Sequence, residues 1–468
     1  MSASAARRRR PWVHAAQRMT SLGAALVAVA AVAAVAHQLT RRAPLDPASA
    51  VATATAALGF LLMGGWIAGR LASQLGLPAL TGQLIAGICA GPSAATALSP
   101  VAVEWGLAAL PTLVSPQDIR YLAGIDALAV AMIGIAAGGE LELSNLRSIA
   151  RRVLSIMAIE MPAVGLAAGG ALALAAWAGA AALGSDVPLP LACTLTGCLM
   201  MASSPAVAIA LMREHGRAGE FAQFAMALIV AKDIVLTVLF TGVLVAGASL
   251  IGSASGTGTG PSAPKAGAVL AWHLLGSLAL GALLSAPLAV VLNRIERRLD
   301  MVALVVAALV AAVARSIDLS PLLAALTMGI ALRTAAPDTS RAYLAATGRI
   351  LLPVCCIFFA LTGAKLDILS IWTALPVTAA ICGARLAAAW AGATAGAAIA
   401  GLEVRTRRWI WACLVPQAGV AIALASEVGT AFAGMAWSAP LTALLISCVA
   451  MNEIVGPPLM RIALRRAQ

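Results

Sequence analysis

The sequence predicts an all-α, polytopic membrane protein. Hydrophobic residues make up 61% of its 468 residues and charged residues only 11%, and the mean hydropathy is +0.96. An ordinary soluble domain carries about a quarter charged residues. A disordered chain, in turn, has far fewer apolar residues than this one. Because a spanning helix takes about 20 apolar residues, the chain has room for many spans.

Successive apolar stretches, separated by short polar turns, predict about 14 transmembrane helices. In order, they cover 20–38, 51–73, 78–97, 119–139, 153–181, 189–212, 219–247, 267–293, 301–316, 319–334, 345–364, 372–400, 408–430 and 437–462. The first stretch follows the basic run Arg7–Arg10 and has features of a signal peptide. No clear small-x-small cleavage site precedes Arg41 and Arg42, so we expect a retained N-terminal span added to a 13-helix core.

The basic residues predict the orientation of these spans. Most of the 31 Lys and Arg residues fall in loops on the same side of the predicted membrane as the N-terminus. This asymmetry indicates an even number of spans with both termini in the cytoplasm, in what we expect to be a bacterial cytoplasmic (inner) membrane. A net charge of +12 would suggest nucleic acid in a soluble protein, but here it reports topology, and we expect no nucleic-acid partner.

The two halves of the sequence resemble each other. Four segments of the first half recur in the same order in the second: Leu77–Leu80 as Ser320–Leu323, Gly139–Leu143 as Ala364–Ile368, Val207–Leu211 as Val420–Leu424 and Lys232–Val235 as Asn452–Val455. An odd number of predicted helices separates equivalent positions, so the halves have opposite topology. Inverted six-helix repeats are typical of secondary transporters, whose substrate site lies near the midplane.

The repeat predicts the domain organisation. The expected parts are a basic N-terminus with its extra span (1–50), a first repeat (51–247), an external loop and linker helix (248–300), a second repeat (301–462) and a short cytoplasmic tail (463–468).

Two spans contain helix-breaking residues at repeat-equivalent positions. Pro205 lies inside the predicted span 189–212, while Pro416, Gln417 and Gly419 lie inside 408–430. A proline in mid-span removes a backbone donor and frees carbonyl groups, which is tolerated only beside protein, a cavity or a bound ion. A single proline in a span could also be explained by a simple helix kink. Because helix-breaking residues occur at equivalent positions in both halves, we expect instead two unwound helices that cross.

Asp233 is the strongest candidate for an ion-binding residue, because it lies at the centre of the span 219–247. A charge at mid-bilayer costs about 2.5–3.5 kcal/mol on insertion scales, so it is expected to be functional. A carboxylate there can hold either a cation or a proton. If both compete for one site that alternates between the two sides, the protein exchanges them. A structural ion pair is the alternative.

Four further charged residues within the predicted spans bear on the site. Lys232 either pairs elsewhere, holds its own proton or lowers the affinity of the site for cations. Arg385 needs a carboxylate partner, for which Glu160, its repeat equivalent, is the first choice and Asp233 the second. Glu453, the counterpart of Asp233, is expected near a helix end, where it caps or anchors the helix.

These residues together resemble the monovalent cation:proton antiporters. The resemblance covers about 51–462 and is carried by Leu75–Gly82 with the glycines that follow, by Ser203–Ala206, by Asp233 in the place of the ion-binding aspartate, and by Arg385. It implies a core domain that moves like an elevator against a dimerisation domain, in a homodimer surrounded by membrane lipid. It also implies that Ser203 and Ser204 of the first broken helix, together with Lys232, lie at the ion and proton site.

The sequence departs from the family pattern at two places. Where this chain has Lys232 and Asp233, many members carry two adjacent aspartates or an Asn-Asp pair. Where it has Ser203 and Ser204, many members carry Thr-Asp. Both departures remove negative charge from the expected site.

The predicted function is exchange of a monovalent cation, Na⁺ or K⁺, for protons, with Asp233 as the shared site. The alternative is sodium-coupled symport of an organic anion on a related scaffold, which would need Arg385 or Lys232 to bind the anion. An enzymatic function is not expected, because the four histidines are widely separated and no spacing fits a metal or a nucleophile–base pair. We expect no cofactor and no bound metal centre.

Overall fold

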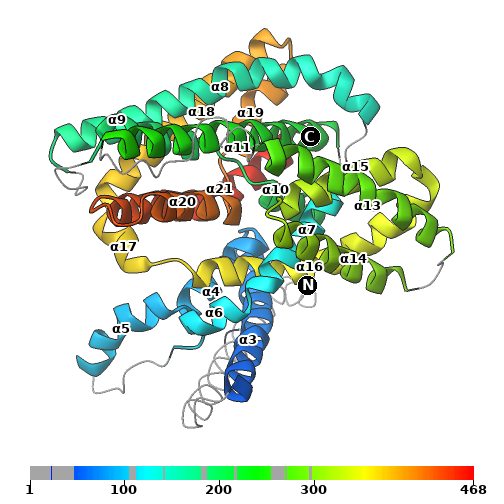
Figure 1. The fold of residues 1–468 in the computed structure, drawn as a ribbon, viewed down its shortest axis with the longest axis horizontal. Helices are drawn as coiled ribbons and strands as arrows, with labels where there is room; N and C mark the ends of the chain where they lie inside the picture. Colours follow the sequence, from blue (N-terminus) through cyan, green and yellow to red (C-terminus); the bar gives the residue numbers. More distant parts are fainter. Residues whose placement is uncertain are drawn as a thin grey trace, which may run out of the picture. The chain divides into compact units, whose positions relative to one another are not determined.

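The computed structural model describes residues 47–104, 112–140, 143–180, 187–215, 219–254, 271–294 and 298–467, with Gly23 and Ala268 as isolated residues. Throughout these ranges the chain forms helices and short connections, and no strand occurs in them (Figure 1). The predicted first span, 20–38, lies outside the described residues except for Gly23. Most of the predicted external loop, from residue 255 onward, also lies outside them.

The helices of the first half precede the linker region. They are α3 (Pro47–Gln74), α4 (Ala79–Ala90), α5 (Pro92–Glu104), α6 (Pro116–Tyr121), α7 (Ala123–Glu140), α8 (Leu143–Trp177), α9 (Leu189–Met200), α10 (Pro205–His215) and α11 (Glu220–Ala254). The linker and the second half follow. They comprise η1 (Trp272–Gly276), α13 (Ser277–Leu292), α14 (Leu299–Ser316), α15 (Pro321–Ala335), α16 (Pro337–Ala364), α17 (Ile368–Thr373), α18 (Leu375–Ile399), α19 (Val404–Cys413), α20 (Gly419–Ala431) and α21 (Ser438–Arg466).

The membrane-spanning character of the chain follows from these lengths. Within the described residues, ten helices are long and apolar enough to cross a membrane, and Ala79–Ala90, Pro321–Ala335 and Gly419–Ala431 are shorter apolar helices. Each predicted span from 51–73 onward coincides with a helix or with two consecutive helices. The expected count of about 14 spans therefore includes helices that are broken or short.

One span that was predicted to be continuous, 78–97, is divided in two. The α4 helix ends at Ala90, Gly91 adopts an extended conformation, and α5 begins at Pro92. The physical reason is the proline, whose ring disfavours the helical conformation of the residue before it.

The described helices form two compact units. The first contains residues up to Asp126 together with Pro353–Ile368, and the second contains Ala127–Leu352 together with the chain from Leu369 onward. Each unit therefore takes helices from both halves of the sequence, and the boundaries of the repeats stay a prediction. In the second unit, an apolar core fills the space between α8, α9, α11, α18, α20 and α21, with Leu172, Leu199, Phe240, Ile381 and Leu445 fully buried.

In the first unit, α4 and α16 pack backbone to backbone. A Cβ atom on Gly87 would collide with the carbonyl group of Ala360, and one on Gly363 would collide with the carbonyl of Leu84. Only glycine permits this approach, which is how small residues bring membrane helices together.

In the second unit, α7 and α15 make the same contact with the equivalent residues. A Cβ atom on Gly329 would collide with the carbonyl of Ile135, and one on Gly138 with the carbonyl of Leu326. The repeat relates Gly87 to Gly329 and Gly138 to Gly363. In the two helix pairs, equivalent glycines therefore contact equivalent residues of the partner helix. These contacts support the internal repeat independently of sequence similarity.

Candidate ion-binding site

The first predicted helix break is present between α9 and α10. The chain leaves the helix after Met200 and re-enters it at Pro205. Ser204 is the N-cap of α10, because its hydroxyl oxygen accepts the backbone N–H of Val207 at 3.2 Å. Proline is favoured at the first helical position, where its missing N–H has no helical partner to lose. The Ser-Pro pair therefore starts the second half-helix.

The second predicted break lies between α19 and α20, and it contacts the first. The backbone N–H of Ser204 donates to the carbonyl oxygen of Pro416 at 2.8 Å, and the hydroxyl of Ser203 donates to the carbonyl oxygen of Leu414 at 2.8 Å. The Gln417 amide donates to the carbonyl oxygen of Leu199 at 3.1 Å. The two unwound segments are therefore joined by direct hydrogen bonds, as crossed broken helices require.

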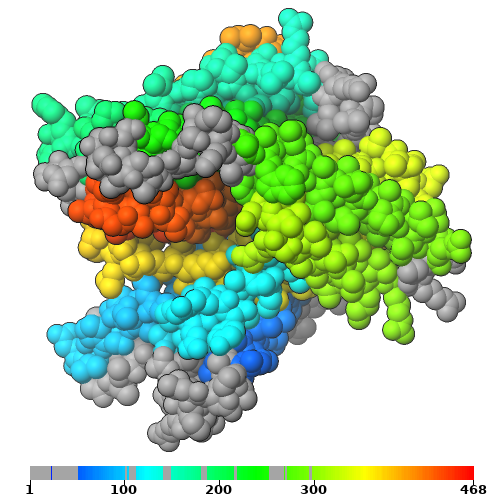
Figure 2. All heavy atoms as spheres, viewed as in Figure 1, coloured from blue at the N-terminus to red at the C-terminus, as the bar shows by residue number. Residues whose placement is uncertain are grey.

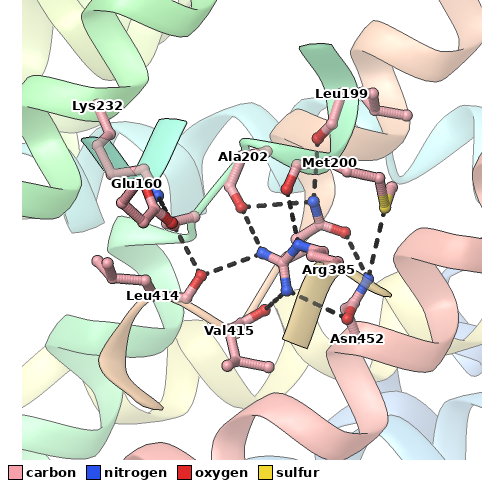
Figure 3. A network of polar contacts seen from close by, with 11 residues as sticks. Glu160, Leu199, Met200, Ala202, Lys232, Arg385, Leu414, Val415 and Asn452 are labelled. Atoms are coloured by element: carbon pink, nitrogen blue, oxygen red, sulfur yellow. Dashed lines mark hydrogen bonds and ion pairs between the residues drawn. The ribbon is translucent and has the colours of Figure 1, made fainter. Parts of the chain in front are cut away.

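Arg385 of α18 lies between the two breaks and uses all of its N–H groups (Figure 3). A guanidinium group carries five N–H donors. Nε donates to Met200 O at 2.7 Å, Nη1 to Val415 O at 2.9 Å and Asn452 Oδ1 at 3.2 Å, and Nη2 to Ala202 O at 2.8 Å and Leu414 O at 3.1 Å. Four of the five acceptors are backbone carbonyls that the breaks have released from helical hydrogen bonding.

Helix dipoles explain why this buried cation needs no carboxylate. The half-helices α9 and α19 both end at the crossing, so their C-terminal carbonyl groups concentrate partial negative charge around Arg385. The predicted ion pair between Glu160 and Arg385 is therefore wrong: no ion pair joins them in the described residues, and the released carbonyls take the place of the carboxylate.

Glu160 of α8 pairs instead with Lys232 of α11. The Lys232 Nζ atom lies 2.7 Å from Glu160 Oε1, and both side chains are almost completely buried. Of the alternatives for Lys232, the structure supports pairing elsewhere. Figure 3 shows this pair beside the Arg385 network.

The internal repeat accounts for both partners. Glu160 is the repeat equivalent of Arg385, and Lys232 is the equivalent of Asn452. The α8–α11 contact between Glu160 and Lys232 therefore corresponds to the α18–α21 contact between Arg385 and Asn452. The repeat therefore relates the two contacts to each other, although it does not by itself predict either of them.

Asn452 is a site residue that sequence analysis missed. Its Oδ1 atom accepts from Arg385, while its Nδ2 donates to Gln417 Oε1 at 3.1 Å and to Cys448 O at 2.9 Å. Asn452 and Gln417 are both fully buried. This amide thus links α21 to the arginine and to the second break.

Asp233 lies one residue from Lys232 and is 6% exposed. Its helix, α11, packs against all four half-helices, α9, α10, α19 and α20. Among the described residues, no hydrogen bond or ion pair reaches its carboxylate, and Glu160 Oε2 also has no hydrogen-bond partner there. The site therefore combines one compensated ion pair with a carboxylate that is available to bind.

The helix ends in the structure correct the predicted positions of two glutamates along their helices. Glu160 lies at the centre of α8, because this helix begins at Leu143, ten residues before the predicted span. Glu453 lies near the centre of α21 and is 1% exposed, so it neither caps nor anchors a helix end. The error for Glu160 arises because α8 continues past the apolar stretch that crosses the bilayer.

A family model described as "Sodium/hydrogen exchanger, transmembrane" matches residues 57–461. The chain belongs to the sodium/hydrogen exchanger family. This is a family of transporters rather than enzymes, and membership supports cation:proton antiport by an integral membrane protein.

Solved structures show the same fold. The structure of the sodium proton antiporter MjNhaP1 from Methanocaldococcus jannaschii at pH 8 superposes with a TM-score of 0.62 at 15% identity, covering 89% of this chain and 99% of that one. An electron-microscopy map of MjNhaP1 gives a TM-score of 0.57 at 15% identity, with 87% and 96% covered. No curated protein matches the sequence.

Proposed function

We propose that this exchanger moves Na⁺ or K⁺ in one direction and protons in the other, with the Asp233 carboxylate as the shared binding site. The observation that carries the proposal is the charge balance of the buried groups. Lys232 and Glu160 compensate each other, and Arg385 is surrounded by carbonyl oxygens. Asp233 is the buried charge beside them that has no such partner in the described chain.

Ser203 and Ser204 are the proposed neutral ligands for the cation. Each hydroxyl is held at the first break, Ser203 by donating to Leu414 O and Ser204 by accepting from Val207 N–H. A hydroxyl oxygen has two acceptor lone pairs, so each retains at least one that a cation can use. A proton on Asp233 removes the negative charge that attracts the cation, which makes the two ions compete.

Symport of an organic anion is disfavoured by the same contacts. It requires a free cationic group at the crossing, and Arg385 and Lys232 were the candidates. All five N–H groups of Arg385 have acceptors, and Lys232 is paired with Glu160. An anion would have to break one of these buried interactions, at a cost of several kcal/mol.

The remaining expectations belong to this proposal. They are an elevator-like movement of the ion-binding core, a homodimer in the lipid bilayer, cytoplasmic termini and a bacterial inner-membrane location.

The test uses proteoliposomes with an imposed proton gradient and an internal pH dye. Adding Na⁺, K⁺ or Li⁺ to the wild type should dissipate the gradient, and the effective ion names the substrate. Asp233→Asn should reduce this response at least 100-fold, because the amide can hold neither the proton nor the cation charge.

Asp300→Asn is the matched control, since Asp300 lies half-exposed in an ion pair with Arg349 at 2.6 Å. It should leave exchange unchanged. Full cation-dependent exchange by a folded Asp233→Asn protein would overturn the assignment of Asp233. No response of the wild type to any of the three cations would overturn monovalent cation exchange itself.

A further inference from the structure

The second unit contains an apolar cavity of about 510 Å³ between three helices. It is lined chiefly by Ala227, Val230 and Ile234 of α11, Leu278 of α13, and Ile330 and Thr334 of α15. Its size lies within the range of pockets that bind small ligands.

The lining offers no hydrogen-bond donor to a ligand. Its two hydroxyls belong to Thr327 and Thr334, and each donates within its own helix, to Leu323 O and to Ile330 O, both at 2.8 Å. Water in a cavity needs two to four polar partners, and a cation needs more. The lining therefore favours an apolar occupant.

The helices around the cavity are apolar on their outer faces as well. Exposed side chains of α13 and α14 include Leu283, Val290, Val305 and Leu309. Figure 2 draws these two helices in green to yellow-green. Because α11, α13 and α14 qualify as membrane spans, lipid hydrocarbon surrounds this region.

One end of the cavity is basic. Thr334 lies beside Arg333 in the last turn of α15. The hydroxyl of Thr339, at the start of α16, donates to Asn293 Oδ1 at 2.8 Å, which places the end of α13 and its neighbour Arg294 at this same end. Arg298 directly precedes α14, and Arg341 and Arg349 lie on α16. The sequence stretches 293–300 and 333–349 together contain six arginines and three acidic residues. Among the described residues, Asp300 pairs with Arg349 and Asp338 with Arg341.

We propose that this cavity binds one anionic phospholipid, with an acyl chain between α11, α13 and α15 and the phosphate group at the Arg294–Arg333 end. Basic pockets between transmembrane helices bind such headgroups through charge attraction. The apolar lining accommodates the acyl chain, and the excess of arginines attracts the negatively charged headgroup. Val230 and Ile234 of the cavity wall flank Asp233 on α11, so the bound lipid contacts the helix that carries the ion site.

The test is native mass spectrometry of the full chain, purified after incubation with phosphatidylglycerol or phosphatidylcholine. The wild type should retain one phosphatidylglycerol per chain, at least 10-fold more than phosphatidylcholine. Ala331→Phe should fill the cavity and reduce this retention about 10-fold. Ala308→Phe, an exposed alanine of α14 outside the cavity, should retain lipid like the wild type. Arg294→Gln with Arg333→Gln should abolish the preference for phosphatidylglycerol.

A second measurement covers the case in which Ala331→Phe does not fold. Phosphatidylglycerol with a photoreactive acyl chain is added to the wild type, and the labelled peptides are mapped. Labels on α11, α13 and α15 at the cavity residues would support the site. Equal retention of both lipids by the wild type, retention unaffected by Ala331→Phe, or labels only outside the cavity would overturn it. None of these readouts depends on ion exchange.

Discussion

The two buried cations at the site are compensated in different ways. Lys232 forms one short ion pair with Glu160, whereas Arg385 spreads its charge over four backbone carbonyls and an amide. The planar guanidinium group has the donor geometry to reach both helix breaks at once, which an ammonium group lacks. The two residues therefore differ in what their removal should do.

Breaking the Lys232–Glu160 pair should be strongly destabilising. Glu160→Gln or Lys232→Gln alone leaves the other charge buried without its partner, at a cost of about 3–5 kcal/mol. We expect a large fall in the apparent melting temperature in detergent. The double variant Lys232→Gln with Glu160→Gln should recover most of it, because no charge is left uncompensated.

The exposed pair of Arg349 and Asp300 is the control for this comparison. Because exposed pairs contribute about 0–1 kcal/mol, Arg349→Gln should change the melting temperature little. A double variant as unstable as the worse single variant would contradict charge compensation as the role of the pair.

Arg385→Lys should be far from conservative. An ammonium group has three donors and cannot serve five acceptors, so at least two carbonyls or amides lose their partner, each costing about 1–3 kcal/mol. We expect a lower melting temperature and a reduced maximal exchange rate from the loosened crossing. Unchanged stability and rate would show that the carbonyls of Met200, Ala202, Leu414 and Val415 do not need the arginine.

At the level of the helices, hydrophobic stretches predicted where the spans lie, and prolines predicted where two of them break. Pro205 and Pro416 identified the crossing because proline acts locally, on its own backbone and the preceding turn. The partners of Glu160 and Arg385 were not predicted, because a pairing depends on which helices pack together. The repeat shows that Glu160 with Lys232 and Arg385 with Asn452 occupy equivalent positions, but only the packing of the helices shows that they are in contact.

The glycine contacts of α4 with α16 and of α7 with α15 predict that a glycine-to-alanine substitution destabilises the protein at either crossing. Gly87→Ala and Gly329→Ala each place a methyl group against a backbone carbonyl, which should cost at least the 1–3 kcal/mol typical of overpacking. Gly170→Ala on α8 has open space around its Cβ position and is the control. Thermal unfolding in detergent should separate the first two variants from the third. Equal melting temperatures for all three would refute close packing at these crossings.

For the whole molecule, the charge balance predicts the stoichiometry. With Lys232 neutralising Glu160, Asp233 is the carboxylate that the proposed site leaves to carry ions, so each cycle should exchange one monovalent cation for one proton. Such a cycle moves no net charge. Moving one elementary charge would respond to a potential of 100 mV by about 2.3 kcal/mol.

The measurement is the final proton gradient reached at a fixed cation gradient, with the membrane potential clamped at zero and at about −100 mV. Equal gradients at both potentials are expected. A gradient that shifts about 50-fold with the potential would instead mean that a second charge moves, and Lys232 or Glu160 would be the group to examine.

Composition and charge asymmetry predicted the class of molecule, since they reflect the bilayer as solvent rather than any particular contact. The division into two units was not predicted. Residues 353–364 belong to the same helix as the preceding part of α16 but pack with the first unit, and no local sequence signal distinguishes them.

The paired glycine crossings bear on how such a chain arose. Each crossing joins a helix of one half to a helix of the other, α4 with α16 and α7 with α15, through equivalent residues. A protein made of one half alone could form neither contact within itself. Two copies inserted in opposite directions, however, would form both. The two crossings are therefore the contacts that two half-length chains in opposite orientations would make, here formed within one chain.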